Sequence, residues 1–257
     1  MSETVVQKPV IVVPARLASQ RFPRKLLAEV AGKPLVLWTA ERIGREVPEF
    51  RLWFAVDGEE IGEVLENAGF ATILTEADLP SGTDRIAVAN DTIGAERVIN
   101  VQADEPLVTR SQIHSLAEAL EKPGADMSTL AYPFEKLEDF RDPNQVKVVR
   151  DKEGFAMYFS RAAIPYPRDD LQAVGGKEFP AYRHLGVYAY SAEFLRIFCE
   201  LPQGTLEKIE KLEQLRAMEN GRRIAVVLTD DISIGVDTPE DLERIAPLLL
   251  ATETEVG

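Results

Sequence analysis

The chain has 257 residues, a length typical of one large domain or of a large domain with a smaller lobe attached. Apolar residues make up 45% and charged residues 28%, which are ordinary globular values and exclude a wholly disordered chain. With 29 basic and 43 acidic residues the formal net charge is -14, which argues against nucleic-acid binding and docking on an anionic membrane. An anionic ligand therefore needs a local basic site.

Cysteine content and hydropathy bear on the compartment. A single cysteine, Cys199, cannot form an intrachain disulfide, and with two histidines a structural zinc site is not expected. The apolar runs are far shorter than the roughly 20 residues of a membrane-spanning helix. The first residues also lack the basic-then-apolar pattern of a secretion signal. We expect a cytoplasmic protein without membrane insertion.

In the first half of the chain, short β-rich runs alternate with longer segments of helical periodicity. The predicted strands are 9–13, 52–56, 71–74 and 98–101, and the predicted helices are 35–47, 59–68, 83–93 and 111–121. Runs such as VIVV and VINV have no polar alternation, which indicates strands covered on both faces. The pattern predicts an α/β fold with a doubly wound, mostly parallel sheet.

From residue 127 onward the pattern changes. The segments MSTLAY, QVKVVRD, FAMYFS and GVYAY predict strands of a small mixed-sheet lobe that covers a ligand. A helix is predicted over 205–220, ended by Gly221. Its apolar side is predicted to carry Leu206, Ile209, Leu212, Leu215 and Met218. Strands follow at 224–228 and 233–236, and Thr238 is predicted to cap a last helix with Pro239 in its first turn.

The loop at 14–25, directly after the first predicted strand, holds four cations and no carboxylate. Ligands of an open α/β sheet bind beyond the carboxyl ends of its strands, so this loop is a candidate phosphate site. Arginine clamps phosphate oxygens bidentately and lysine acts as a mobile point charge, a mixture suited to a polyphosphate. The alternative is a solvated basic turn. The loop lacks the glycine framework of a Walker motif.

Two acidic positions follow predicted strands. Asp104 and Glu105 come after the strand at 98–101, and Asp237 comes after the strand at 233–236. Carboxylate oxygens at strand ends are suitable ligands for magnesium when a nucleotide supplies the others. As alternatives, Asp104 caps a turn and Asp237 caps the last helix. Taken together, the two aspartates predict two protein oxygens that hold one metal.

The loop at 79–85 combines a glycine with small hydroxyl side chains before a predicted helix. Its exposed amides suit contact with the edge of a flat base. In the alternative interpretation, its serine and threonine do no more than cap the helix.

These segments, in this order, resemble the 3-deoxy-manno-octulosonate (Kdo) cytidylyltransferases, also called CMP-Kdo synthetases. The resemblance spans nearly the whole chain, and its specificity lies in the order and separation of the motifs. The matching segments are 12–25, 81–85, 100–106, 144–147, 158–161 with 164–165, 183–188, 211–216 and 235–242.

The resemblance implies a single domain, 1–257, with a Rossmann-like nucleotidyltransferase fold and a sugar-binding and dimerisation lobe at roughly 127–205. It implies that the anomeric 2-hydroxyl of Kdo, an eight-carbon acid sugar, attacks the α-phosphate of CTP to give CMP-Kdo and pyrophosphate. It also implies that the product serves lipopolysaccharide synthesis. The resemblance also implies dependence on Mg²⁺ and a homodimer.

The resemblance further implies roles for individual residues. Asp104 and Asp237 ligate magnesium and, with Lys25, are the catalytic residues. The residues implied on the nucleotide side are Ala15, Arg16, Ser19, Lys25, Ser81, Gly82 and Gln102, and those on the sugar side are Arg161, His184, Tyr188, Glu213 and Gln214. Among the latter, Arg161 is expected to pair with the sugar carboxylate.

Several sugar-side residues have ordinary structural interpretations as well. His184 is alternatively a hydrogen-bonded histidine at the start of a strand. Tyr188 and Tyr190, which alternation places on one side of a strand, are alternatively core or interface aromatics. Glu213 and Gln214 are alternatively solvated helix positions.

The chain departs from the family pattern at three positions. Arg24 and Ala103 stand where relatives often have glycine, and Leu26 stands where they often have proline. At Arg24 the φ angle must be negative or strained. Competing functions are a cytidylyltransferase for the 8-amino analogue of Kdo or for a sialic acid, and a non-catalytic nucleotide-sugar-binding protein. The presence of both aspartates argues against the latter.

Overall fold

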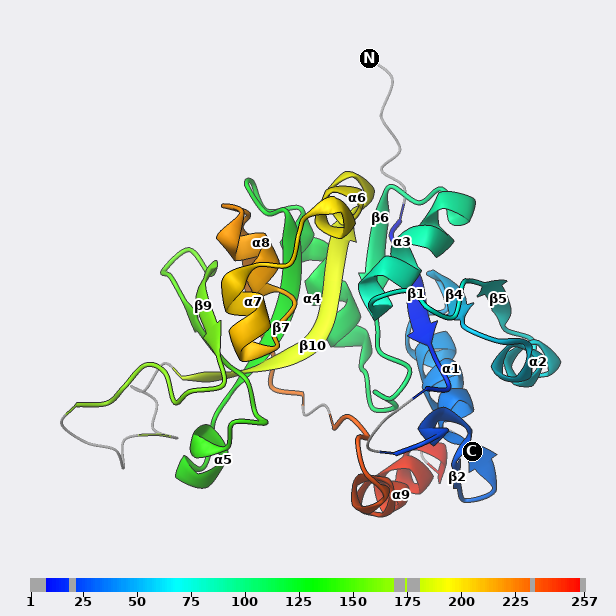
Figure 1. The fold of residues 1–257 in the computed structure, drawn as a ribbon. Helices are drawn as coiled ribbons and strands as arrows, with labels where there is room; N and C mark the ends of the chain where they lie inside the picture. Colours follow the sequence, from blue (N-terminus) through cyan, green and yellow to red (C-terminus); the bar gives the residue numbers. More distant parts are fainter. Residues whose placement is uncertain (1–7, 19–21, 169–173, 175–180, 232–233, 255–257) are drawn as a thin grey trace. The chain divides into compact units, whose positions relative to one another are not determined.

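The computed structural model describes residues 8–18, 22–168, 174, 181–231 and 234–254 (Figure 1). The chain folds into two compact units. The first unit comprises Met1–Ile113 and Ser233–Gly257, and the second comprises His114–Ile232. In the described residues, no helix is long and apolar enough to cross a membrane.

The first unit is built on four parallel strands in the order β6, β1, β4, β5. Their bounds are β1 (Val10–Ala15), β4 (Arg51–Val56), β5 (Ala71–Leu74) and β6 (Arg97–Asn100). In β1, the side chains of residues 10–13 are at most 1% exposed, so both faces of this central strand are covered. The predicted parallel sheet is confirmed, and its unbroken apolar runs reflect this two-sided burial.

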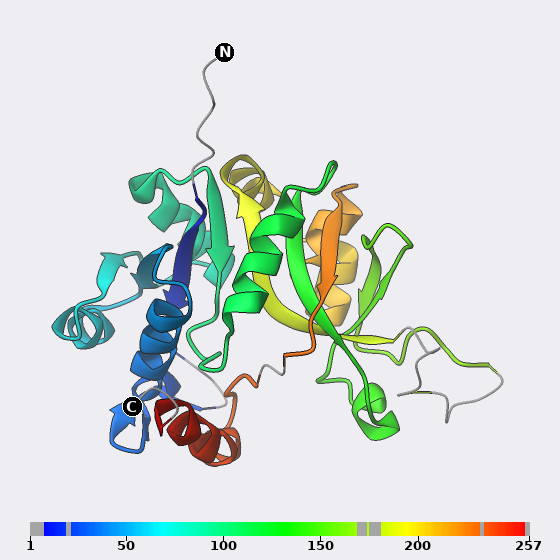
Figure 2. The same cartoon turned by 180° about the vertical axis from the view of Figure 1, so that it is seen from behind.

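Helices cover both faces of this sheet: Figures 1 and 2, seen from opposite sides, place α1 and α3 on opposite faces of β1. The first-unit elements are α1 (Leu35–Glu46), α2 (Glu59–Asn67), α3 (Gly82–Ile93), α9 (Pro239–Thr254), the short 3-10 helix η1 (Lys25–Leu27) and the strand pair β2 (Glu29–Val30) and β3 (Lys33–Pro34). Helix α4 (Arg110–Leu120) begins in the first unit and ends in the second. The doubly wound arrangement is confirmed.

The second unit holds a mixed sheet in which β11 pairs with β7 in parallel, while β10 pairs with β7 and β8, and β8 with β9, antiparallel. The strands are β7 (Met127–Pro133), β8 (Lys147–Arg150), β9 (Ala156–Ser160), β10 (Tyr182–Ser191) and β11 (Ile224–Leu228), and the helices are α5 (Leu137–Arg141), α6 (Ala192–Glu200), α7 (Thr205–Glu210) and α8 (Leu215–Glu219). The predicted mixed sheet is confirmed.

The predicted helix over 205–220 is wrong, because the chain forms two short helices, α7 and α8. Lys211 ends α7 in the left-handed region, at φ 54°. A buried ion pair then joins the two helices, with Arg216 Nη2 2.7 Å from Glu207 Oε1. The predicted apolar side also fails, since Ile209 is 73% exposed and Leu206 36%.

The predicted strand at 233–236 is wrong for residues 234–236, which belong to no strand; residue 233 lies outside the described residues. The backbone N–H of Val236 instead donates to the carbonyl oxygen of Asp104 at 3.0 Å. This segment therefore bonds to the loop after β6, and the bond brings the two predicted metal-binding aspartates to neighbouring places.

Candidate active site

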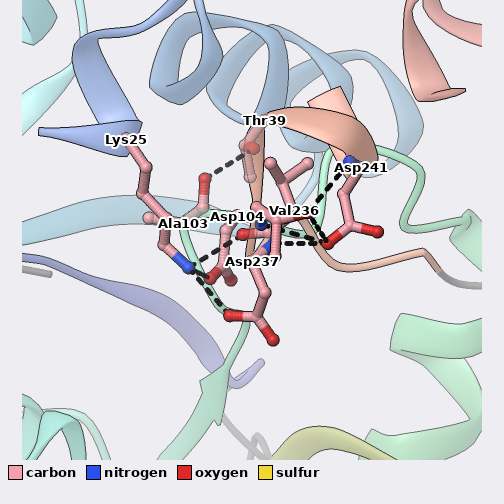
Figure 3. A network of polar contacts seen from close by, with 8 residues as sticks. Lys25, Thr39, Ala103, Asp104, Val236, Asp237 and Asp241 are labelled. Atoms are coloured by element: carbon pink, nitrogen blue, oxygen red, sulfur yellow. Dashed lines mark hydrogen bonds and ion pairs between the residues drawn. The ribbon is translucent and has the colours of Figure 1, made fainter. Parts of the chain in front are cut away.

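Three predicted catalytic residues of the first unit meet around one ammonium group (Figure 3). Lys25 Nζ donates to the carboxylate of Asp104, to the carbonyl oxygen of Val236 at 2.8 Å and to Asp237 Oδ1 at 3.3 Å. The side chain of Lys25 is 14% exposed, while those of Asp104 and Asp237 are 23% and 48% exposed. The cluster is thus partly shielded from water on the lysine side and open on the Asp237 side.

The chain around Asp104 is fixed from both sides. Thr39, on α1, donates its hydroxyl to the carbonyl oxygen of Ala103 at 2.8 Å. Thr39 is fully buried and Ala103 is 4% exposed. Together with the bond from Val236 N–H, this contact holds the loop after β6 against both α1 and the segment before α9.

Asp237 is positioned by the start of α9. Asp241 Oδ2 accepts hydrogen bonds from the backbone N–H groups of Asp237 and Thr238, each at 3.1 Å. Thr238 Oγ1 in turn accepts from the backbone N–H of Asp241 at 3.2 Å, which is the reciprocal arrangement of a capping box. The expected cap by Thr238 is confirmed. Asp237 is left with its carboxylate directed to Lys25.

The carboxylates of Asp104 and Asp237, called the carboxylate pair below, suit a divalent cation. Both place hard oxygen atoms around a single cation, here the ammonium of Lys25. Within the described part of the chain, no group of three or more histidine, cysteine or acidic side chains could hold a metal. Two protein oxygens suit Mg²⁺ because this ion usually keeps water and substrate phosphate as its other ligands.

The cationic loop is largely paired with acids where the structure describes it. Ala15 ends β1 and Arg16 follows it, and the backbone N–H of Leu17 donates to both carboxylate oxygens of Asp57 at 3.1 Å. Arg24 forms an exposed ion pair with Glu60. Its φ of 59° is left-handed, so the strained alternative expected at this non-glycine position is the one observed. Ser19 and Arg21 lie outside the described residues.

The loop before α3 combines a helix cap with a close approach to the β1 loop. Ser81 Oγ accepts from the backbone N–H of Asp84 at 3.1 Å, so the expected helix cap is confirmed. A Cβ atom on Gly82 would lie 3.4 Å from Pro14 Cγ, at ordinary van der Waals distance, so this loop lies against the residue just before Ala15. Gln102 Nε2 donates to Asn100 Oδ1 at 2.8 Å.

Arg85 supports the segment that precedes this loop, a role that was not predicted. The residue is 2% exposed and donates to the hydroxyl of Thr75 and, at 3.1 Å, to the carbonyl oxygen of Glu76. Desolvation lowers the pKa of Arg85, and the negative charge of Asp57 opposes that shift. Arg85 ties α3 to the segment after β5; the only signal in the sequence was its place in the motif at 81–85.

The residues predicted to lie on the sugar side all belong to the second unit, and two of them lie on β10. His184 Nε2 is 3.0 Å from Thr129 Oγ1, and its ring packs edge-on against Phe159 at 4.9 Å between centroids. The hydrogen-bonded histidine at a strand start is therefore observed. Desolvation, assisted by the charge of Arg183, lowers the pKa of His184 from its usual 6.5 to about 3, so its ring is neutral near pH 7.

Tyr188 lies beside His184, with 5.4 Å between their ring centroids. Desolvation, and to a lesser degree the charge of Glu213, raise the pKa of Tyr188 and keep its phenol protonated. Tyr190 lies 5.9 Å from Tyr188 between centroids, which agrees with the expected common side of the strand. The side chains of His184 and Tyr188 are therefore both neutral near pH 7.

Arg161 is bound to backbone carbonyls. Its Nε donates to the carbonyl oxygen of Glu210 at 2.6 Å, and its Nη1 to that of Pro143 at 3.0 Å. Its own carbonyl oxygen accepts from Lys147 Nζ at 2.8 Å; Lys147 is completely buried, and the sequence marked it only as part of the matching segment 144–147. This network joins the end of β9 to the end of α7.

Glu213 and Gln214 lie in the bend between α7 and α8, so their assignment to a continuous helix is wrong. Gln214 is 4% exposed, and the solvated alternative is wrong for it. Within the described residues, its buried Nε2 has no hydrogen-bond partner. An unpaired amide donor in the bend is suited to a polar ligand.

Comparison with known proteins gives the family. The cytidylyltransferase family model matches residues 10–224. The 3-deoxy-manno-octulosonate cytidylyltransferase of Syntrophobacter fumaroxidans is 47% identical, covering 93% of this chain and 95% of the relative. That of Syntrophotalea carbinolica is 45% identical, covering 91% of this chain and 95% of the relative.

Comparison with solved structures supports the same family. The structure of a CMP:2-keto-3-deoxy-manno-octonic acid synthetase complexed with CTP has a TM-score of 0.87 and 33% identity, covering 96% of this chain and all of the other. A cytidylyltransferase from Leptospira borgpetersenii has a TM-score of 0.61 at 12% identity, covering 96% of this chain and 94% of the other, and shows the shared fold. The chain belongs to the 3-deoxy-manno-octulosonate cytidylyltransferase family of nucleotidyltransferases.

Proposed function

We propose that this enzyme transfers the cytidylyl group of CTP to the anomeric 2-hydroxyl of Kdo, giving CMP-Kdo and pyrophosphate for lipopolysaccharide synthesis. The observation that carries the proposal is the Lys25 cluster, in which a lysine and two carboxylates lie beyond the strand ends of a doubly wound sheet. The relatives named for this activity are 44–47% identical to the chain, which supports Kdo as the acceptor.

The chemistry requires positioning and charge compensation more than covalent help. The bond from the α-phosphorus to the bridging oxygen of pyrophosphate breaks as the sugar oxygen bonds to that phosphorus, roughly in line. In our proposal Lys25 and Arg16 offset the phosphate charge. The carboxylate pair would hold Mg²⁺, and this ion, when bound, would lower the pKa of the attacking hydroxyl and stabilise the phosphate oxygens.

A histidine base is not part of the proposal. The depressed pKa of His184 leaves its ring neutral, and Tyr188 is likewise neutral, so these side chains contribute hydrogen bonds and contact area on the sugar side. We assign the same side to Arg161, Glu213 and Gln214. Ser81, Gly82 and Gln102 are assigned to the cytosine or ribose, and Ala15 and Ser19 to the loop that surrounds the triphosphate.

We further propose that the protein acts in the cytoplasm, where CTP is made, and as a homodimer. The partners are CTP and the acid sugar, with neither nucleic acid nor membrane insertion. Equilibrium sedimentation at two protein concentrations tests the dimer, and a mass equal to one chain at both would contradict it.

Pyrophosphate release tests the function directly. CTP is supplied with Kdo, with the 8-amino analogue of Kdo and with a sialic acid, and UTP and ATP replace CTP as controls for the base. We expect release with CTP and Kdo and little with UTP or ATP. Preferential use of the 8-amino analogue would favour the rival sugar, and absence of release with every acceptor would favour a non-catalytic binding protein.

A further inference from the structure

The ammonium of Lys25 lies where a divalent cation would contact the carboxylate pair. It is in contact with oxygen atoms of Asp104, Asp237 and Val236. One positive charge thus faces two negative charges, and the lysine side chain is mostly buried. Such a group satisfies both carboxylates in the absence of metal, because the electrostatic repulsion between them is offset by the charge between them.

The same ammonium is needed by the triphosphate in the proposed reaction. A lysine nitrogen has three donors, and here carboxylate and carbonyl oxygens accept from it. Lys25 must therefore leave this position before its ammonium can bind phosphate oxygens. Its departure also frees the two carboxylates. The binding of metal and the binding of triphosphate are then coupled through Lys25, since the metal binds the carboxylates that the lysine leaves and the triphosphate binds the lysine.

We propose that Lys25 acts as a stand-in for the divalent cation and excludes it from the carboxylate pair until the triphosphate withdraws the ammonium. The inference rests on the proposed function and extends it to the binding of metal and nucleotide. Without triphosphate, the metal must displace the ammonium of Lys25 from the carboxylate pair, and no phosphate is present to bind that ammonium. Triphosphate supplies that partner, so each ligand favours the other by the same coupling free energy.

Metal binding without nucleotide tests this inference. Mn²⁺, as a probe for Mg²⁺, is titrated into the full chain, and free Mn²⁺ is followed by its paramagnetic resonance signal. The Lys25→Met variant should bind one Mn²⁺ at least about tenfold more tightly than the wild type, because a charge a few ångströms from the ion is removed. Lys25→Arg, which keeps the charge, should remain within about threefold of the wild type.

Lys33→Met is the matched control. Lys33 also belongs to the first unit, where its ammonium pairs with Glu41 at 2.6 Å and lies over the ring of Trp38. This variant has the same net charge as Lys25→Met but leaves the carboxylate pair and its lysine unchanged. Its affinity for Mn²⁺ should equal that of the wild type, whereas equal tightening in both variants would mean that net charge alone is responsible and would overturn the inference.

A melting experiment covers the case in which Lys25→Met is poorly folded. Unshielded carboxylates should lower its melting temperature without metal, and Mn²⁺ should raise that temperature in the variant more than in the wild type. If the wild type makes CMP-Kdo while Lys25→Met gains neither affinity nor melting temperature from Mn²⁺, the inference is wrong and the proposed function stands. If Lys25→Met gains affinity and melting temperature from Mn²⁺ but the wild type forms no CMP-sugar, the proposed function is wrong instead.

Discussion

Asp241 holds Asp237 by its backbone, with Oδ2 accepting from the N–H of Asp237 at 3.1 Å (Figure 3). The contact joins the stability of a helix end to the placement of a proposed metal ligand. The same carboxylate completes the cap of α9 with Thr238. One side chain therefore serves both the fold and the site.

Replacing Asp241 with alanine should affect both the stability of the protein and the placement of Asp237. We expect Asp241→Ala to lower the free energy of unfolding by about 1 kcal/mol through the lost cap, and to raise the Mg²⁺ concentration needed for half-maximal activity. Thr238→Ala is the control, since it removes the hydroxyl but leaves the bond from Asp237 N–H to Asp241. Urea unfolding and magnesium titration measure the two effects. An equal magnesium requirement in both variants would contradict a positioning role for Asp241.

His184 should make the protein less stable in acid. Its pKa is about 3 in the folded state and near 6.5 in the unfolded state, so the unfolded chain binds more protons between these values. Stability should therefore fall as the pH drops from about 6.5 towards 3, with a share from His184 of roughly 1–2 kcal/mol at pH 5. Urea unfolding of the wild type and of His184→Gln at pH 7.5 and pH 5 isolates this share. An equal loss in both proteins would show that the histidine does not contribute.

The break between α7 and α8 gives a pair of glycine variants that should differ in stability. Lys211 has a φ of 54°, whereas Lys208 lies inside α7. Lys211→Gly should change the free energy of unfolding by no more than a few tenths of a kcal/mol, or raise it by up to about 1 kcal/mol, because glycine adopts this conformation without strain. Lys208→Gly should lower it by about 1 kcal/mol. Similar losses in both variants would contradict the left-handed break.

These elements show what the sequence could predict. Helix α1 was placed almost to the residue, because its helical periodicity reflects one buried face. Strand β5 has its predicted bounds although none of its residues is fully buried. The bend at Lys211 was not predicted, because periodicity encodes neither its left-handed backbone nor the buried ion pair between Glu207 and Arg216.

The site was predicted in part. Lys25, Asp104 and Asp237 were identified, and the structure brings them together. The predicted strand before Asp237 was wrong, because 234–236 forms no strand and is joined to Asp104 by a backbone hydrogen bond from Val236. Buried Arg85 and Lys147 were not assigned supporting roles, since nothing local marks a charged side chain that is satisfied by distant carbonyl oxygens.

Gln214 allows stability and sugar binding to be separated. Its buried Nε2 has no partner among the described residues, and such a donor destabilises the ligand-free protein. Gln214→Met should leave the free energy of unfolding unchanged or raise it by about 1 kcal/mol, while raising the KM for Kdo at least about tenfold with little change in the KM for CTP. If the KM for Kdo is unchanged, Gln214 does not bind the sugar.

The most direct test of the account is a crystal structure with Mn²⁺ and CTP, in which the anomalous signal of manganese locates the ion. We predict a peak between the carboxylates of Asp104 and Asp237, within coordination distance of both, with Lys25 Nζ moved onto phosphate oxygens. A peak elsewhere, with Lys25 still bound to both aspartates and the triphosphate held by other groups, would contradict the account.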